Sequence, residues 1–119
     1  VRPVTWVCPN IRVRVISKKL EGGKYYSQKG VVHDVLSRFV FSVVMDKDKK
    51  LIENVIEKNV ETALPKAGGK AMVVLGKHKG KIGTVLERNS RLQKCVLQFD
   101  EDLQHYQCGF EKLAEYVSH

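Results

Sequence analysis

The sequence lacks the features of a secreted, metal-bound or membrane-spanning protein. Its 119 residues include three cysteines, Cys8, Cys95 and Cys108, without CxxC spacing. An odd number of scattered cysteines disfavours a disulfide framework and favours reduced thiols inside the cell. No apolar run approaches the roughly 20 residues that span a bilayer, and no signal peptide is visible. The chain begins at Val1 rather than Met, so we expect a piece of a longer protein.

Nucleotide-binding loops are also absent. The glycine- and lysine-rich stretch at residues 74–85 suggests a phosphate-cradling loop at first sight. However, only three residues separate Gly76 from Gly80, and Ile82 follows Lys81. A P-loop needs four residues between its glycines and a hydroxyl after its lysine. The dinucleotide pattern GxGxxG is missing too, so both nucleotide interpretations fail.

Catalytic and metal-binding clusters are equally scarce. Cys95, His105 and Cys108 form a Cys/His set of only three members, and Cys95 alternates with apolar residues as a core position would. A zinc site usually needs four ligands, and a nucleophile needs a base and an oriented third group. We therefore expect no enzyme activity, no metal site and no cofactor.

Positive charge is abundant and unevenly distributed. Twenty-one Lys and Arg against 13 acids give a net charge of +8 and a pI near 9.5. Residues 1–38 hold eight basic residues against two acids, and residues 66–94 hold eight against one. Residues 39–65 and 95–119 are acidic on balance. A polyanion is therefore the first partner to consider, and we expect the opening loops and strands to form a positive face that both halves can share.

Short strands, rather than helices, are predicted along the chain. IRVRVI at residues 11–16 alternates apolar and basic residues, as a half-buried strand does. A charged turn at residues 46–50 and PKAGG at residues 65–69 interrupt the pattern. Other strand-like runs lie at residues 31–36, 39–45, 71–75, 83–86 and 95–99. Short strands at this spacing indicate small β-barrels.

The two halves of the chain are similar to each other. Asp46 maps to Asp100 at an offset of 54, EKNVE at residues 57–61 maps to EKLAE at residues 111–115, and Gly30 maps to Gly83 at 53. We therefore predict two domains, residues 1–65 and residues 66–119. Because a barrel of about 60 residues buries only about 60% of its unfolded surface, we expect the two to pack as a rigid pair.

The stretch VVLGKHKGKIGTV at residues 73–85 resembles a KOW motif. This motif recurs in ribosomal proteins, NusG-like elongation factors and several nuclear RNA-binding proteins. The resemblance implies an SH3-like five-stranded barrel that contacts RNA or proteins of the RNA machinery. The predicted fold is therefore all-β, with two tandem SH3-like barrels packed together. Residues 18–29 contain only Gly22 and Gly23, so the KOW turn itself is expected in the second barrel alone.

The whole chain resembles the C-terminal region of the G-patch and KOW-motif family. Trp6, IRVRVI, GGKYY at residues 22–26, ETALP at residues 61–65 and AEYV at residues 114–117 carry this resemblance. The KIN nuclear nucleic-acid-binding family has the same tandem layout and is the alternative. The resemblance implies a nuclear protein associated with pre-mRNA splicing.

The leading hypothesis is a monomeric, non-enzymatic module that binds single-stranded RNA with low sequence preference. Spliceosomal proteins are further expected partners, and no membrane contact is expected. His78, Tyr25 and Tyr26 are candidates for stacking on unpaired bases. The residues predicted to contact phosphates are Lys70, Lys77, Lys79, Lys81, Arg88, Arg91 and Lys94 in the second half, and Arg12, Arg14, Lys18, Lys19, Lys24 and Lys29 in the first. The alternative is a protein-docking module, in which the acidic segment at residues 100–102 faces a basic partner.

Overall fold

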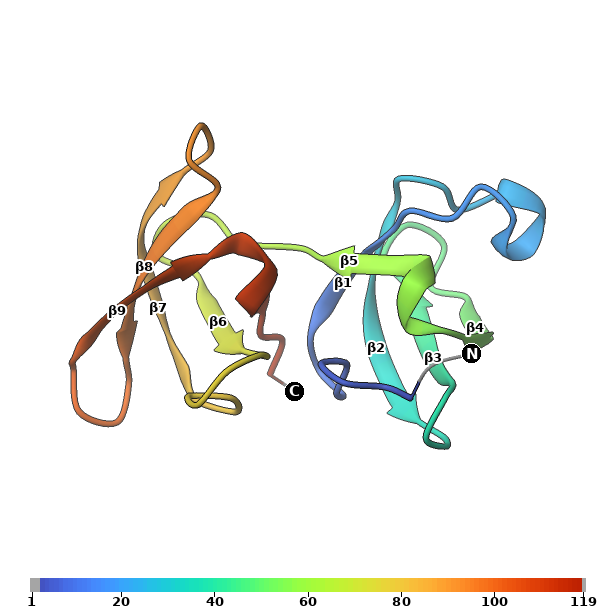
Figure 1. Cartoon of the computed structure of the whole chain (residues 1–119). Coiled ribbons are helices and arrows are strands. Elements are labelled where there is room, and N and C mark those ends of the chain that lie inside the picture. Colours follow the sequence, from blue (N-terminus) through green and yellow to red (C-terminus); the bar gives the residue numbers. More distant parts are fainter. Residues whose placement is uncertain (1–2, 119) are drawn as a thin grey trace.

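The computed structural model describes residues 3–118 and contains two five-stranded antiparallel sheets (Figure 1). The predicted all-β fold, with two small SH3-like barrels packed together, is confirmed. Three short 3-10 turns, at Leu20–Gly23, Glu57–Asn59 and Phe110–Lys112, interrupt the strands, and residues 3–118 include no α-helix. The strands are β1 (Arg12–Val15), β2 (Lys29–Val35), β3 (Phe41–Met45), β4 (Leu51–Val55), β5 (Val60–Thr62), β6 (Lys70–Val73), β7 (Ile82–Asn89), β8 (Lys94–Phe99), β9 (His105–Gly109) and β10 (Leu113–Glu115).

The first barrel consists of β1 to β5, in the spatial order β4-β3-β2-β1-β5. Alternation in β1 decides its orientation, because Val13 and Val15 are buried while Arg12 and Arg14 are not. The predicted strand at residues 11–16 is shorter in the structure, since Ile11 forms only an isolated bridge with Tyr116.

The second barrel consists of β6 to β10, in the corresponding order β10-β6-β7-β8-β9. Its own core contains Val73, Val85, Leu97, Phe99 and Leu113. β7 and β8 extend beyond the barrel as a long arm that projects at the upper left of Figure 1. A register shift between Val85 and Glu87 marks the place where β7 leaves the barrel.

The barrels share an apolar interface because β6 and the residue that follows it contact both cores. Ala71 and Val73 belong to the second core, whereas Val74 is fully buried in the first cluster and Met72 packs against it. Ala114 of β10 joins the same first cluster. A strand covered on both sides loses the apolar–polar alternation, which explains the unbroken apolar run AMVVL in this part of the sequence.

Backbone hydrogen bonds also join the two barrels. The Glu115 N–H donates to the Ala63 carbonyl at 2.8 Å, and the Val117 N–H donates to the Asn10 carbonyl at 2.8 Å. The segment between β5 and β6 is held on its other side, because the Gly68 N–H donates to the Val85 carbonyl at 2.7 Å. The first of these bonds joins the end of β10 to the residue after β5, so the inner edges of the two sheets meet there.

Strand registers place Asp46 and Asp100 at the same position of the two sheets, and likewise Gly30 and Gly83. The correspondence expected for Glu57 differs by one residue, because Val60 and Leu113 occupy the same register position. Glu57 therefore corresponds to Phe110 rather than to Glu111. The extra residue belongs to β4, where the register against β3 shifts and Asn54 has a φ of 58°.

Candidate nucleic-acid interface

The KOW-like turn between β6 and β7 is closed by its own backbone. The Gly80 N–H donates to the Val73 carbonyl at 2.8 Å, and the Lys79 N–H donates to the Gly76 carbonyl at 3.1 Å. Gly76 and Gly80 have φ values of 93° and 94°, a region that side-chain-bearing residues rarely adopt. The glycine spacing therefore builds a tight turn in which Lys77 and Lys79 are exposed.

The three lysines of this turn differ in their contacts. Lys77 is exposed and makes no ion pair in the described part of the chain. The Lys79 ammonium donates to the Thr5 carbonyl at 2.5 Å, which ties the turn to the N-terminal segment. The Lys81 ammonium lies 5.0 Å from the centre of the Phe99 ring. Lys77 is the one of the three with the greatest freedom to meet a phosphate.

His78 packs against its own barrel. Its ring lies 5.3 Å from Phe99 and 4.8 Å from Tyr106, centroid to centroid, and the contact with Tyr106 is edge-on. Phe99 and Tyr106 stack at 5.5 Å. The predicted stacking of His78 on a base would require its ring to leave this aromatic cluster.

The opening loop of the first barrel separates its two tyrosines. Tyr25 is 4% exposed and donates its hydroxyl to Asp48 at 2.9 Å, so it is a core residue. Tyr26 is 45% exposed, and the Lys18 ammonium lies 5.2 Å from its ring centre. Lys19 and Lys24 lie in the same loop, with Lys24 near the Tyr25 ring. Of these two tyrosines, Tyr26 is thus the exposed one, with Lys18 over its ring.

The two opening loops do not form one continuous face. Figure 1 shows the Leu20–Gly23 turn at the outer upper right of the first barrel, and the turn between β6 and β7 at the lower side of the second. Their positive charges therefore lie on well-separated surfaces. The expected face common to both opening loops is therefore absent from the described part of the chain.

Predicted residues of both barrels do meet in a groove between them. This groove has a volume of about 600 Å³, and its lining includes Arg14, Lys29 and Arg88. The Arg88 guanidinium donates to the Pro65 carbonyl at 3.0 Å and lies 5.5 Å from the Phe110 ring. Arg14 is loosely paired with Glu61 at 3.4 Å. Arg91 and Lys94 lie on the β7–β8 arm beside the lining residues Ser90 and Gln93.

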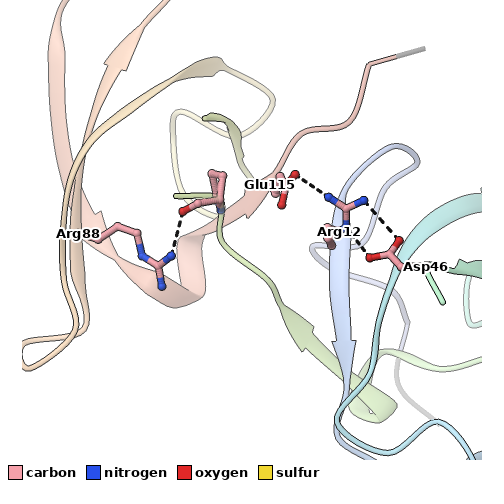
Figure 2. Close-up of polar contacts among 5 residues, drawn as sticks. Arg12, Asp46, Arg88 and Glu115 are labelled. Carbon is pink, nitrogen blue, oxygen red and sulfur yellow. Dashed lines mark hydrogen bonds and ion pairs between the residues drawn. The ribbon is translucent and has the colours of Figure 1, made fainter. Parts of the chain in front are cut away.

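Arg12 and Lys70 occupy the same position in the two sheets, and both are ion-paired. Lys70 contacts Asp100 at 2.7 Å on an exposed surface. Figure 2 shows Arg12 between two carboxylates: its Nε lies 3.0 Å from Asp46, and its Nη1 lies 2.6 Å from Glu115 of the other barrel. Burial opposes the charge, but Glu115 and Asp46 outweigh it and raise the pKa of Arg12. Arg12 therefore joins the barrels rather than facing open solvent.

Glu57 has a role that sequence reasoning missed. Its carboxylate accepts the N–H groups of Thr5, Trp6 and Val7 at 2.9–3.0 Å, and the Thr5 hydroxyl at 2.7 Å. Burial alone would raise the pKa of Glu57, but these hydrogen bonds outweigh it and lower the pKa. Capture of backbone N–H groups has no side-chain signature, so no motif in the sequence could have revealed it.

The cysteines and the other ionisable groups form no metal cluster in the described part of the chain. No group of three or more His, Cys, Asp or Glu side chains there is arranged to hold a metal ion. Cys95 and Cys108 lie directly opposite each other on β8 and β9, both buried. Burial is the main cause that raises the pKa of Cys108 to about 11. Among residues 3–118, no helix has the length and apolarity of a membrane span.

Comparison with known proteins identifies the family. Residues 11–118 match the family described as the GPKOW C-terminal domain. Similar proteins include Protein MOS2 of Arabidopsis thaliana, 33% identical over 95% of this chain and 24% of its own length. The G-patch domain and KOW motifs-containing protein of Xenopus laevis is 38% identical over 81% of this chain and 20% of its length. A KIN17-like protein of Oryza sativa subsp. indica is 36% identical over 82% of this chain and 23% of its own length.

The chain thus spans about a quarter or less of these relatives. Both families named by the sequence resemblance recur among them. The match to the family extends across both barrels, from the residue before β1 to residues beyond β10. The chain therefore belongs to the GPKOW C-terminal domain family.

Proposed function

We propose that the chain is an RNA-binding module of a nuclear, splicing-associated protein, and that its exposed cations contact RNA phosphates. The surplus of unpaired cations carries this proposal. Of the 13 predicted basic residues, only Arg12, Arg14 and Lys70 form ion pairs within residues 3–118, so ten have no acidic partner. A cation without an acidic partner can meet a phosphate without first breaking an ion pair, and the contact releases counterions.

Two basic regions qualify as the contact surface. The turn set is Lys77, Lys79 and Lys81. The groove set is Lys29 on one wall of the inter-barrel groove, with Arg91 and Lys94 on the arm beside its other wall. A flexible single strand can follow a positive groove more easily than a rigid duplex can, which favours single-stranded RNA.

The test is titration of the 119-residue chain with an eight-nucleotide single-stranded RNA, followed by NMR and by fluorescence anisotropy. Lys77→Ala/Lys79→Ala/Lys81→Ala removes the turn set, and Lys29→Ala/Arg91→Ala/Lys94→Ala removes the groove set. The matched control is Lys47→Ala/Lys49→Ala/Lys50→Ala, which removes three charges from the turn between β3 and β4. We expect each set to weaken binding and the control to change it little.

Salt provides a second readout. If three phosphates are contacted, binding should weaken by about 20-fold between 50 and 200 mM salt, because single strands release about 0.7 counterion per contact. Affinity that barely changes with salt, or that falls equally in the control variant, contradicts the proposal.

A further inference from the structure

The outer edges of the two sheets are uncovered within residues 3–118. β4 and β9 end the strand orders and pair with no further strand there, whereas the inner edges β5 and β10 meet each other. An uncovered edge presents unpaired backbone N–H and C=O groups. Natural proteins usually blunt such edges with bulges, charges or proline, because another strand can pair with them.

β4 carries this protection. Its register against β3 shifts between Phe41 and Val43, and Asn54 has a φ of 58° in the irregular stretch. Lys49 and Lys50 precede the strand, and the exposed Glu53 lies within it. A bulged and charged edge resists the addition of another strand.

β9 carries none of these devices. Its five residues pair with β8 without a register shift, from Lys94–Gly109 to Gln98–His105. The sequence HYQCG contains no proline, lysine, arginine or acidic residue. His105 and Gln107 are exposed. The second barrel therefore has a regular outer edge at the position where the first barrel has an irregular one.

Hydrogen-bond alternation shows which groups of β9 face outward. The Phe110 N–H donates to Gln93, and the Phe99 N–H donates to Gln104, each at 2.9–3.0 Å. In an antiparallel ladder bonded pairs alternate, so Tyr106 and Cys108 direct their backbone groups toward β8. The backbone N–H and C=O groups of His105, Gln107 and Gly109 consequently face the open edge. They form a row that a new strand can pair with.

Charges at the two ends of the edge indicate the kind of strand. The acidic turn, residues 100–102, adjoins His105, and of its three carboxylates only Asp100 is ion-paired among the described residues. Lys94 and Glu111 lie near the Gly109 end, where their charges offset each other. The acidic turn attracts a cation and repels RNA phosphates, so the observations favour a peptide over RNA at this edge.

We propose that the open edge of β9 binds an extended peptide by strand addition, with a lysine or arginine of the peptide against the acidic turn. The main-chain bonds provide affinity, and alternate side chains provide selectivity. On one face the peptide meets Tyr106, which is partly exposed beside the aromatic cluster with Phe99 and His78. An apolar residue at every second position suits that face. This site lies along the outer edge of β9 and adjoins the two basic sets only at Lys94, near its Gly109 end, and at His78, beside Tyr106. It does not depend on RNA binding.

The test uses the 119-residue chain and a synthetic peptide, Ser-Val-Thr-Val-Thr-Val-Thr-Lys-Lys, and is followed by NMR. The C-terminal lysines of this peptide reach the acidic turn when it pairs antiparallel to β9. We expect shifts and slowed amide exchange at His105, Gln107 and Gly109. Gln107→Pro removes one outward N–H while the bonds to β8 remain, and it should weaken binding about ten-fold because a main-chain bond and the close approach of the strand are lost. Gln107→Thr keeps the N–H and should bind within about two-fold of the unchanged chain.

Glu101→Lys tests the charge term and leaves the hydrogen bond from the Gln104 N–H to Asp102 in place. It should weaken binding of the same peptide about five-fold at low salt. If Gln107→Pro does not fold, this charge variant still tests the proposal. A peptide with glutamates in place of its lysines should bind more weakly. These results together support docking of a basic extended segment.

Other outcomes overturn the proposal. The first is an absence of shifts at 1 mM peptide, which is about a hundred-fold excess over a dilute sample and enough to detect mM affinity. The second is a set of shifts confined to the turn set or the groove. Equal binding of the glutamate peptide, or displacement of the peptide by single-stranded RNA, also contradicts it. Protection of the same amides that grows with protein concentration alone would instead indicate pairing between two copies.

Discussion

In the first barrel the ion pair of Arg12 and Asp46 faces the other barrel, whereas in the second barrel the corresponding pair, Lys70 and Asp100, faces solvent. Arg12 lies opposite Val31 and Lys70 opposite Thr84, each one residue beyond the matching glycine. The Lys70 and Asp100 side chains are 51% and 47% exposed, against 22% and 35% for Arg12 and Asp46. The same position therefore serves the interface in one barrel and only the surface in the other.

A second contrast concerns Glu57 and its counterpart Phe110. Glu57 holds the N-terminal segment on the first barrel through four hydrogen bonds. Phe110 instead lies in the inter-barrel groove under the Arg88 guanidinium. One barrel thus uses this position to bind backbone N–H groups, and the other uses it to support an arginine. The shared topology leaves such positions free to diverge.

Removal of the two cations should show the largest difference. Arg12→Ala leaves Asp46 and Glu115 facing each other in a partly buried interface, and we expect a loss of about 2 kcal/mol in the free energy of unfolding. Lys70→Ala breaks an exposed pair and should cost about 0.5 kcal/mol. Urea unfolding of both variants measures the difference. Equal losses would mean that Glu115 adds nothing to the interface.

Glu57→Ala should have an intermediate effect of about 1–2 kcal/mol, because it removes charge-assisted hydrogen bonds to three backbone N–H groups. The pKa of Glu57 is lowered in the folded chain, so its contribution to stability is present above the unfolded pKa of about 4.3 and is lost as pH falls through the folded pKa. Urea unfolding at pH 7 should therefore show a lower free energy of unfolding for Glu57→Ala than for the unchanged chain. In acid the two free energies should converge. A gap that persists unchanged into acid would contradict this account.

The cysteine pair should show the smallest effect. Cys95 and Cys108 correspond to Phe41 and Val55 of the first core, so Cys108→Val should change stability by less than about 1 kcal/mol. In the unchanged chain, a pKa raised to about 11 leaves Cys108 protonated at pH 8. Its alkylation should be at least about 100-fold slower than that of a cysteine in unfolded protein. Rapid labelling of native Cys108 would instead indicate a reactive thiol.

Much of the fold was predictable because its signals are local. Alternation in β1, the glycines of the KOW-like turn and the charged turn after β3 each depend on residues close in the chain. The short strands β5 and β10 were less accessible. They contain three residues each, and their pairing partners lie 40 or more residues away.

The candidate site was predictable in composition and not in arrangement. The sequence by itself determined the all-β class, the two similar halves, the tight turn around Gly76 and Gly80 and the surplus of cations, since backbone preference and charge belong to each residue. Only the tertiary structure decided that Arg12 joins the barrels, that His78 packs on Phe99 and Tyr106, and that the two opening loops lie apart. The first and third outcomes depend on how β6 and β10 pack against the first barrel, and no local pattern encodes the direction in which two packed barrels face. The packing of His78 depends on contacts with β8 and β9, which lie about 20 or more residues further along the chain.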